Sequence, residues 1–281
     1  MRNIIVGLVA LAVALAFFGC GEEETPPPSP PSITAPEVTP IPYDDSIKVV
    51  WTQSPEHNEE GFAGYYLYVS KNVSLEDMDE AALGTHLVFT SPTSDTEYLM
   101  TDYFGDTLED GAIYYFGVRA VRTTENGDTV SPIEVVETSP VMLGGGRIYF
   151  IGSDTVCGFN FEHNIALTVD QTDPEPDMVL DTSTTSESGL VIKSPHLAGT
   201  VWTGVSQFKI LGVGNIDDFP ETADADWEEQ VDVSSTKVTV VKTAQNHYVK
   251  LKITSFGTDE EGRYYINFQY KYQTKTNYPH F

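Results

Sequence analysis

Two alternating segments near the C-terminus constrain the fold of this chain more than any other feature. Residues 247–256 read HYVKLKITSF, and residues 262–272 read GRYYINFQYKY. In an extended strand, Val249, Leu251 and Ile253 share one face, and the residues between them share the other. A short glycine-bounded segment connects the two. The pattern predicts an antiparallel β-hairpin with one apolar face.

Further runs of strand-forming residues recur along the chain at short spacing. Thr, Val, Tyr and Phe are plentiful, which favours strands over helices. The runs cover residues 46–51, 64–70, 85–90, 96–100, 112–121 and 129–136, and then 147–151, 157–161, 177–181, 190–193, 208–211 and 237–242. A short helix is expected over residues 74–84, which have a capping-box start and a glycine stop. The expected fold class is therefore all-β, with two antiparallel β domains.

Residues 108–121, together with Trp51, resemble a known family. The segment reads LEDGAIYYFGVRAV and resembles the corner and following strand of a fibronectin type III domain. The resemblance implies that Tyr114 is the corner tyrosine, whose hydroxyl bonds back to the chain, and that Gly111 permits the turn. It also implies that Trp51 is the core tryptophan of the second strand. A fibronectin type III β-sandwich is thus expected over residues 36–142.

The C-terminal hairpin and the strand before it carry a second resemblance. The strand VTVVKT, followed by YVKLKITSF and YYINFQYKY, resembles the C-terminal end of HmuY-like proteins, which are all-β envelope lipoproteins. The resemblance implies a HmuY-like β domain over residues 146–281, and the glycines at 144–146 are expected to form a hinge-like linker before it. Some HmuY-like proteins capture haem, so the resemblance also implies a ligand-binding role.

Haem capture requires axial ligands, usually His or Met, on loops that close over an apolar slot. His196 is the best placed candidate because its loop, SPHLAG, lies in the middle of the second domain. His196 is therefore the predicted cofactor-binding residue, and an exposed loop histidine without a ligand is the alternative. The other candidates in this domain are His163, Met178, His247 and His280.

The first twenty residues predict export and lipid anchoring. Arg2 precedes an apolar segment, residues 4–18, of about fifteen residues, which is short for a membrane span. The segment ends at Gly19 and Cys20 and resembles a bacterial lipoprotein signal, in which the cysteine thiol is acylated. Residues 1–20 are thus expected to be a signal peptide, with Cys20 as the lipidation site. An ordinary signal peptide or a retained anchor is the alternative.

Residues 21–35 read GEEETPPPSPPSITA and cannot build a core. They are expected to form a semi-rigid tether. The expected location is the bacterial cell envelope, where the lipid anchor holds the chain to the membrane, at the outer membrane or the cell surface.

The charge and the missing motifs exclude several functions. The chain carries 42 acidic and 15 basic residues, a net charge of −27, and should be repelled by nucleic acid. The sequence contains no nucleophile elbow, HExxH, P-loop or CxxC motif, so neither an enzyme nor a metal site is expected. The acidic segment 217–229 is interpreted as a solvated loop, and Cys157 as a buried, inert thiol.

Four aromatic residues flank loops rich in Gly and Asp in the second domain. They form either a ligand platform or plugs of the core, and the core interpretation is favoured. These residues are Trp202, Phe208, Phe219 and Trp227.

Together these features predict a lipid-anchored envelope protein with a binding role. The second domain is expected to capture haem or another small ligand. The alternative is a structural or adhesive surface protein that binds glycans, other polymers or protein partners through its β domains.

Overall fold

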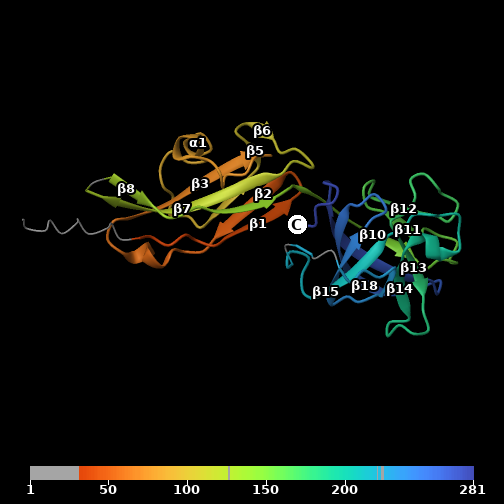
Figure 1. The fold of residues 1–281 in the computed structure, drawn as a ribbon. Helices are drawn as coiled ribbons and strands as arrows, with labels where there is room; N and C mark the ends of the chain where they lie inside the picture. The colour runs from red at the N-terminus through yellow and green to blue at the C-terminus, as the bar shows by residue number, and fades with distance from the viewer. Residues whose placement is uncertain (1–31, 126, 220, 223–224) are drawn as a thin grey trace, which may run out of the picture. The chain divides into compact units, whose positions relative to one another are not determined.

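The computed structural model describes residues 32–281 except Asn126, Pro220, Ala223 and Asp224. Cys20, the predicted signal peptide and most of the tether lie outside these residues. Strands dominate the described chain (Figure 1). Among the described residues, no helix is long and apolar enough to cross a membrane.

The first β domain consists of two antiparallel sheets that share one apolar core. One sheet has the order β1–β2–β4, with bounds Val38–Tyr43, Ser46–Trp51 and Glu97–Met100. The other has the order β3–β7–β8, and β9 also pairs with β7; the bounds are Phe62–Lys71, Tyr114–Thr124, Gly127–Val130 and Glu134–Thr138. A small hairpin joins β5, Asp102–Tyr103, to β6, Asp106–Thr107.

The expected tyrosine corner is present. The Glu109 amide donates to the hydroxyl oxygen of Tyr114 over 2.9 Å, and Gly111 adopts a φ of 73° in the turn between them. Trp51 is 3% exposed, and its ring meets that of Tyr65 edge-on at a centroid distance of 6.0 Å. The predicted roles of Tyr114, Gly111 and Trp51 are confirmed.

The insertion between β3 and β4 is less regular than expected. Helix α1 covers only Glu80–Gly84, because Asp79 caps it by accepting from the Ala82 amide over 2.8 Å. The expected strand over residues 85–90 is reduced to an isolated bridge between Leu87 and Tyr68. Buried Leu83 packs against Tyr68 and holds the segment on the sheet.

The second β domain is also a pair of antiparallel sheets. The first has the order β10–β19–β18–β17–β15, with bounds Val141–Tyr149, Tyr264–Gln273, Tyr248–Thr258, Lys237–Lys242 and Gln207–Val213. The second has the order β12–β11–β13–β14–β16, with bounds Ile165–Leu167, Gly158–Asn160, Met178–Thr182, Leu190–Lys193 and Gln230–Asp232. The predicted C-terminal hairpin is β18–β19. Strands β12 and β16 were not predicted because three residues give no readable alternation.

One apolar core lies between the two sheets of the second domain. Phe159 and Leu180 come from one sheet, and Leu251 and Phe268 come from the other. The rings of Phe159 and Phe268 meet edge-on at a centroid distance of 4.8 Å. Burial of such side chains is the main favourable term in folding a domain of this kind.

The polar face of the C-terminal hairpin is also covered. Lys250 is 1% exposed and donates to the carbonyl oxygens of Asp218 and Phe219, both over 3.1 Å. Lys271, opposite Lys250 on β19, pairs with Asp217 over 2.6 Å. The acidic segment 217–229 therefore packs in part against this face and is not wholly solvated as expected.

The glycines at 144–146 do not form the expected hinge, because they lie within the continuous strand β10. A Cβ atom on Gly144 would lie 2.3 Å from Cζ of Tyr270, and one on Gly146 would lie 2.9 Å from Cε2 of Phe159. These glycines are needed because aromatic rings pack directly on the strand. Glycine is required here because aromatic rings lie against the backbone of β10, and it does not indicate a flexible linker.

The substitution Gly144→Ala tests this packing. The added methyl group should force Tyr270 aside and lower the free energy of unfolding by roughly 1–3 kcal/mol. Gly257→Ala is the matched control in the same sheet, because the nearest atom to its added methyl group would be the Tyr265 hydroxyl oxygen at 3.7 Å, an ordinary contact. Urea unfolding curves measure both. Equal midpoints for Gly144→Ala and the parent chain would contradict the packing described.

Candidate functional site

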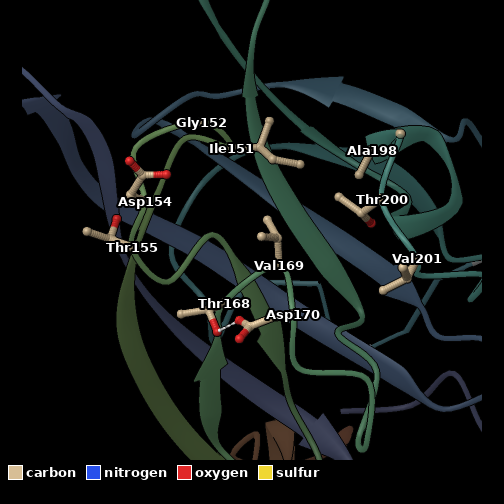
Figure 2. A pocket seen from close by; sticks show the side chains of 11 residues that line it. Ile151, Gly152, Asp154, Thr155, Thr168, Val169, Asp170, Ala198, Thr200 and Val201 are labelled. Carbon is tan, nitrogen blue, oxygen red and sulfur yellow. Dashed lines mark hydrogen bonds between the residues drawn. The ribbon is translucent and has the colours of Figure 1, made fainter.

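A cleft of about 890 Å³ in the second domain is the strongest candidate site. Three loops form it: one after β10, one between β12 and β13, and one before β15. Figure 2 shows their side chains around a shared space. The lining residues are Ile151, Gly152, Asp154, Thr155, Thr168, Val169, Asp170, Ala198, Gly199, Thr200 and Val201.

Aliphatic side chains form much of the cleft wall. Ile151 and Ala198 pack against a buried cluster of Cys157, Val179 and Trp202, which lies behind the lining. Val169 and Val201 are 44% and 62% exposed. Exposed aliphatic side chains around one hollow are typical of a ligand site.

Hydrogen bonds tie two of the three loops together. The Trp202 indole Nε1 donates to the carbonyl oxygen of Gln171 over 2.7 Å. The Gly204 amide donates to Oε2 of Glu175 over 2.7 Å, and Thr203 also bonds to this carboxylate. These bonds fix the segment of residues 168–175 against the segment of residues 198–204, so the cleft is formed before any ligand arrives.

Buried polar groups attach the same segment to the sheet. Asp177 is 4% exposed, and its Oδ2 accepts from the Phe161 amide over 2.9 Å. Its own amide donates to the Phe159 carbonyl over 2.8 Å. Burial raises the pKa of the Asp177 carboxyl to about 7, and the nearby charge of Glu162 adds to the shift.

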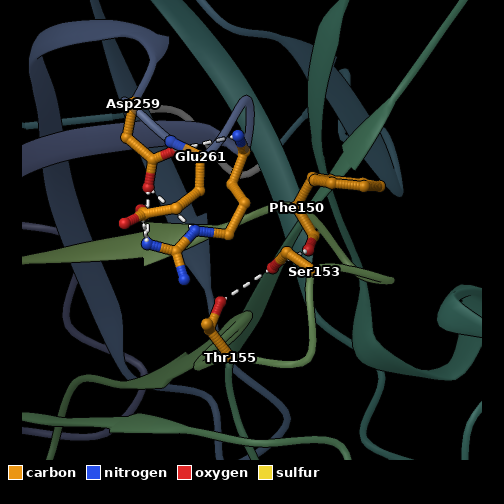
Figure 3. Close-up of polar contacts among 6 residues, drawn as sticks. Phe150, Ser153, Thr155, Asp259 and Glu261 are labelled. Atoms are coloured by element: carbon orange, nitrogen blue, oxygen red, sulfur yellow. Dashed lines mark hydrogen bonds and ion pairs between the residues drawn. The ribbon is translucent and has the colours of Figure 1, made fainter.

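The loop after β10 has its own internal bonds, drawn in Figure 3. The Ser153 hydroxyl donates to the Phe150 carbonyl over 2.7 Å and lies 2.7 Å from Oγ1 of Thr155. The Phe150 amide donates in turn to the carbonyl of Tyr264 on β19 over 3.0 Å. This loop is therefore held to strand β19 of the first sheet.

Two carboxylates supply the charge of the lining. Oγ1 of Thr168 donates to Oδ1 of Asp170 over 2.5 Å, and this bond lowers the pKa of Asp170 below its ordinary value. Asp154 is exposed on the opposite loop (Figure 2). The carboxylate oxygens of both residues can accept hydrogen bonds from a ligand.

The predicted ligand His196 does not line the cleft. It lies in the 3-10 helix η2, Pro195–Ala198, whose last residue is part of the wall. Its Nδ1 is 2.8 Å from the Ser194 hydroxyl, and its Nε2 is 3.7 Å from Oε2 of Glu229. Both ring nitrogens thus face protein groups.

The other predicted axial ligands also lie away from the cleft lining. Met178 is fully buried in the sandwich core. His163 contacts Asn160, His247 stacks on Tyr272, and His280 approaches Glu221. No group of three or more His, Cys, Asp and Glu side chains that could hold a metal ion occurs among the described residues.

The remaining sequence candidates have core or edge positions. Trp202 and Phe208 are buried, as the core interpretation expects, whereas Phe219 and Trp227 are only partly buried. Cys157 is 1% exposed, and burial raises the pKa of its thiol to about 11, so the thiolate is scarce at neutral pH.

No sequence pattern predicted the cleft itself. Its lining residues follow no motif and come from loops far apart in the chain, which meet only in the folded domain. The cis peptide bond between Asp173 and Pro174, in one of these loops, was likewise not predicted.

Comparisons with known proteins bear on the fold alone. No protein family model matches the sequence, and no curated protein matches it. Among solved structures, the chain is similar to the third fibronectin type III domain of the human KIAA0343 protein, with 20% identity and a TM-score of 0.27. The match covers 43% of this chain and 93% of that one. A likeness of this size carries no argument about the site.

The chain is an all-β protein with several antiparallel sheets. A fibronectin type III-like domain, with its tyrosine corner at Tyr114, occupies part of its length, and further β-sheets follow.

The substitution Asp177→Asn tests the buried carboxyl through pH. An unfolded aspartate titrates near 3.8, whereas the folded group titrates at about 7. Between these values the folded state binds the extra proton, so this group's contribution to stability is lost as pH rises through 7. From pH 4 to pH 8, the variant should gain roughly 2–4 kcal/mol in free energy of unfolding relative to the parent.

Urea unfolding at several pH values measures this difference. Comparison with the parent chain at each pH cancels the effect of the large net charge. A difference between the two chains that does not change with pH would contradict the burial of an ionisable carboxyl at this position.

Proposed function

We propose that this chain is a lipid-anchored binding protein of the bacterial cell envelope and that its second β domain captures a small ligand. The observation that carries the binding role is the cleft lined by Ile151, Val169 and Val201. Its volume, about 890 Å³, lies in the range of small-molecule sites, and its walls combine aliphatic surface with a few polar groups.

The cleft is also rigidly supported, which favours binding. The bonds from Trp202 to Gln171 and from Gly204 to Glu175 hold its loops in place. Binding in a preformed cleft is tighter than binding in a flexible one, because no free energy is spent on ordering the loops. The C-terminal hairpin's resemblance to HmuY-like envelope proteins supports the same role for this domain.

A small ligand other than haem fits the cleft better than haem does. Its described lining contains neither His nor Met, and its charged groups are the carboxylates of Asp154 and Asp170. These would repel the two propionates of haem. Haem bound by His196 would need another slot and the displacement of Ser194 or Glu229 from its ring.

The anchoring role rests on the N-terminal sequence. Residues 4–18 are apolar, Gly19 precedes Cys20, and a proline-rich tether follows. Acylation of Cys20 would attach the chain to a membrane, and the tether would hold the two β domains away from the lipid surface.

Adhesion through the β domains is the second candidate function. Phe104 favours it, because this side chain is 57% exposed at the tip of the β5–β6 hairpin. An exposed aromatic residue at such a tip could contact a polymer or a protein partner.

The binding role is tested with Nile red, a neutral apolar dye, and the full chain. We expect one dye molecule per chain and weaker binding in Val169→Trp, whose indole would occupy part of the cleft. Val213→Trp is the control, because Val213 is 74% exposed and outside the lining. Undiminished binding by Val169→Trp, or no binding by the parent chain, would remove the cleft as the site.

A haem titration of the same chains separates the two ligand classes. We expect no sharp Soret band at one equivalent. Such a band in the parent chain, lost in His196→Ala, would instead establish haem capture at the histidine predicted from the sequence.

The anchoring role is tested by growing expressing bacteria with a labelled fatty acid. The parent chain should incorporate label and partition with membranes, because lipid chains on Cys20 bury methylene groups in the bilayer. Cys20→Ser should lose both properties, whereas Cys157→Ser should keep them. Label that persists in Cys20→Ser would refute acylation at this cysteine.

A further inference from the structure

The cleft has a one-sided charge. Asp154 and Asp170 belong to its lining, and no Lys, Arg or His is among the described lining residues. The carboxylates come from two different loops, with Val169 labelled between them in Figure 2. An anionic ligand would meet only like charge here, so the lining selects against phosphates, carboxylates and sulfates.

A cation next to the loop after β10 is already engaged. Arg263 precedes Tyr264, whose carbonyl holds the loop after β10. Its Nε donates to Asp259 over 2.8 Å, and its Nη2 also pairs with Glu261. Dashed lines in Figure 3 mark the bonds at Asp259 and Glu261. This guanidinium is held by its own hairpin turn and leaves the carboxylates of the cleft uncompensated.

Both cleft carboxylates keep free acceptor positions. Asp170 accepts from Thr168 through Oδ1, which leaves Oδ2 without a side-chain bond in the described part of the chain. Asp154 makes no side-chain hydrogen bond or ion pair to any described residue, and it is exposed. A carboxylate oxygen with an open acceptor position binds an ammonium donor more strongly than a neutral donor.

The wall between these acceptors is aliphatic. Ile151, Val169, Ala198 and Val201 contribute it, and no aromatic ring is among the described lining residues. Stacking of a sugar ring or a cation–π contact therefore has no partner within the lining. Methylene groups, in contrast, can pack on this wall and are stabilised there by removal from water.

We propose that the cleft binds an aliphatic diamine or polyamine. The ammonium groups pair with Asp154 and Asp170, and the methylene chain between them packs on Val169 and its aliphatic neighbours. This inference rests on the proposed function, since it names the ligand class of the same cleft. A ligand with a positive charge at each end and an apolar middle matches a cleft with carboxylates on two loops and an aliphatic wall.

Isothermal titration calorimetry of the full chain tests the proposal with 1,6-diaminohexane. The buffer contains about 150 mM NaCl, which limits attraction by the net charge of the whole chain to a range of about 8 Å. The comparison ligands are hexylammonium, with one charge, and 1,6-hexanediol, with none. We expect one diamine per chain, bound more tightly than hexylammonium, and weakest binding for the diol.

Single substitutions locate the charge contacts. Asp154→Asn and Asp170→Asn should each weaken diamine binding about tenfold, as expected for one charge-assisted bond. Glu260→Gln removes an exposed carboxylate of the same domain outside the cleft and should change nothing. Equal weakening in all three variants would mean that only the overall charge acts, and the proposal would be wrong.

Three further outcomes would each refute part of the proposal, and they separate it from the proposed function. If hexanediol binds as tightly as the diamine and both are blocked in Val169→Trp, the cleft is a ligand site but not an amine site. If neither the diamine nor Nile red binds the parent chain, the proposed binding function itself fails. If hexylammonium equals the diamine, only one carboxylate is used and two-point binding is refuted.

Discussion

The packing of Phe159 between the sheets is the contact on which the second domain depends. Its ring meets Phe161, Phe268 and Tyr270 at centroid distances of 5.5, 4.8 and 5.7 Å. It also lies against Gly146, where a Cβ would come within 2.9 Å. The Phe159 side chain therefore links the second sheet to β10 and β19 of the first sheet. Because protein interiors are closely packed, a smaller side chain here would leave a destabilising cavity.

That contact also determines where the cleft lies. The carbonyl of Phe159 accepts from the Asp177 amide, and Asp177 in turn binds the Phe161 amide. The loop that ends at Asp177 carries Thr168, Val169 and Asp170 into the cleft. Trp202 then fastens the neighbouring loop to it. The site is thus built from loops, but hydrogen bonds to the sheets or to a neighbouring loop hold each of them, which gives rigidity to an otherwise irregular surface.

The sheets could be predicted well from the sequence, because the alternation of apolar and polar residues along a strand shows which side chains are buried. Val249, Leu251 and Ile253 all face the core, and β14 and β17 have the bounds expected from their apolar runs. The corner at Tyr114 was recognisable because a turn glycine and a tyrosine stand at fixed spacing. The cleft was not predictable, because Asp154, Asp170 and Val201 meet only through long-range packing.

Two predictions were wrong for the same physical reason. Groups that are distant in the sequence pack on these strands, and the alternation of apolar and polar residues does not reveal that packing. The glycines at 144–146 resemble a linker in sequence, but they make room for Tyr270 and Phe159. The acidic segment 217–229 was interpreted as a solvated loop, but its Asp218 carbonyl accepts from Nζ of Lys250, which is 1% exposed. In both cases the covering group lies far away in the chain.

Amide hydrogen exchange of the free full chain shows whether the cleft is formed without a ligand. The amides of Gly204 and Asp177 should exchange slowly, because each donates a hydrogen bond that fixes a cleft loop. Exchange of both amides at the rate of an unstructured chain would show that these loops are not held and that the cleft is not preformed.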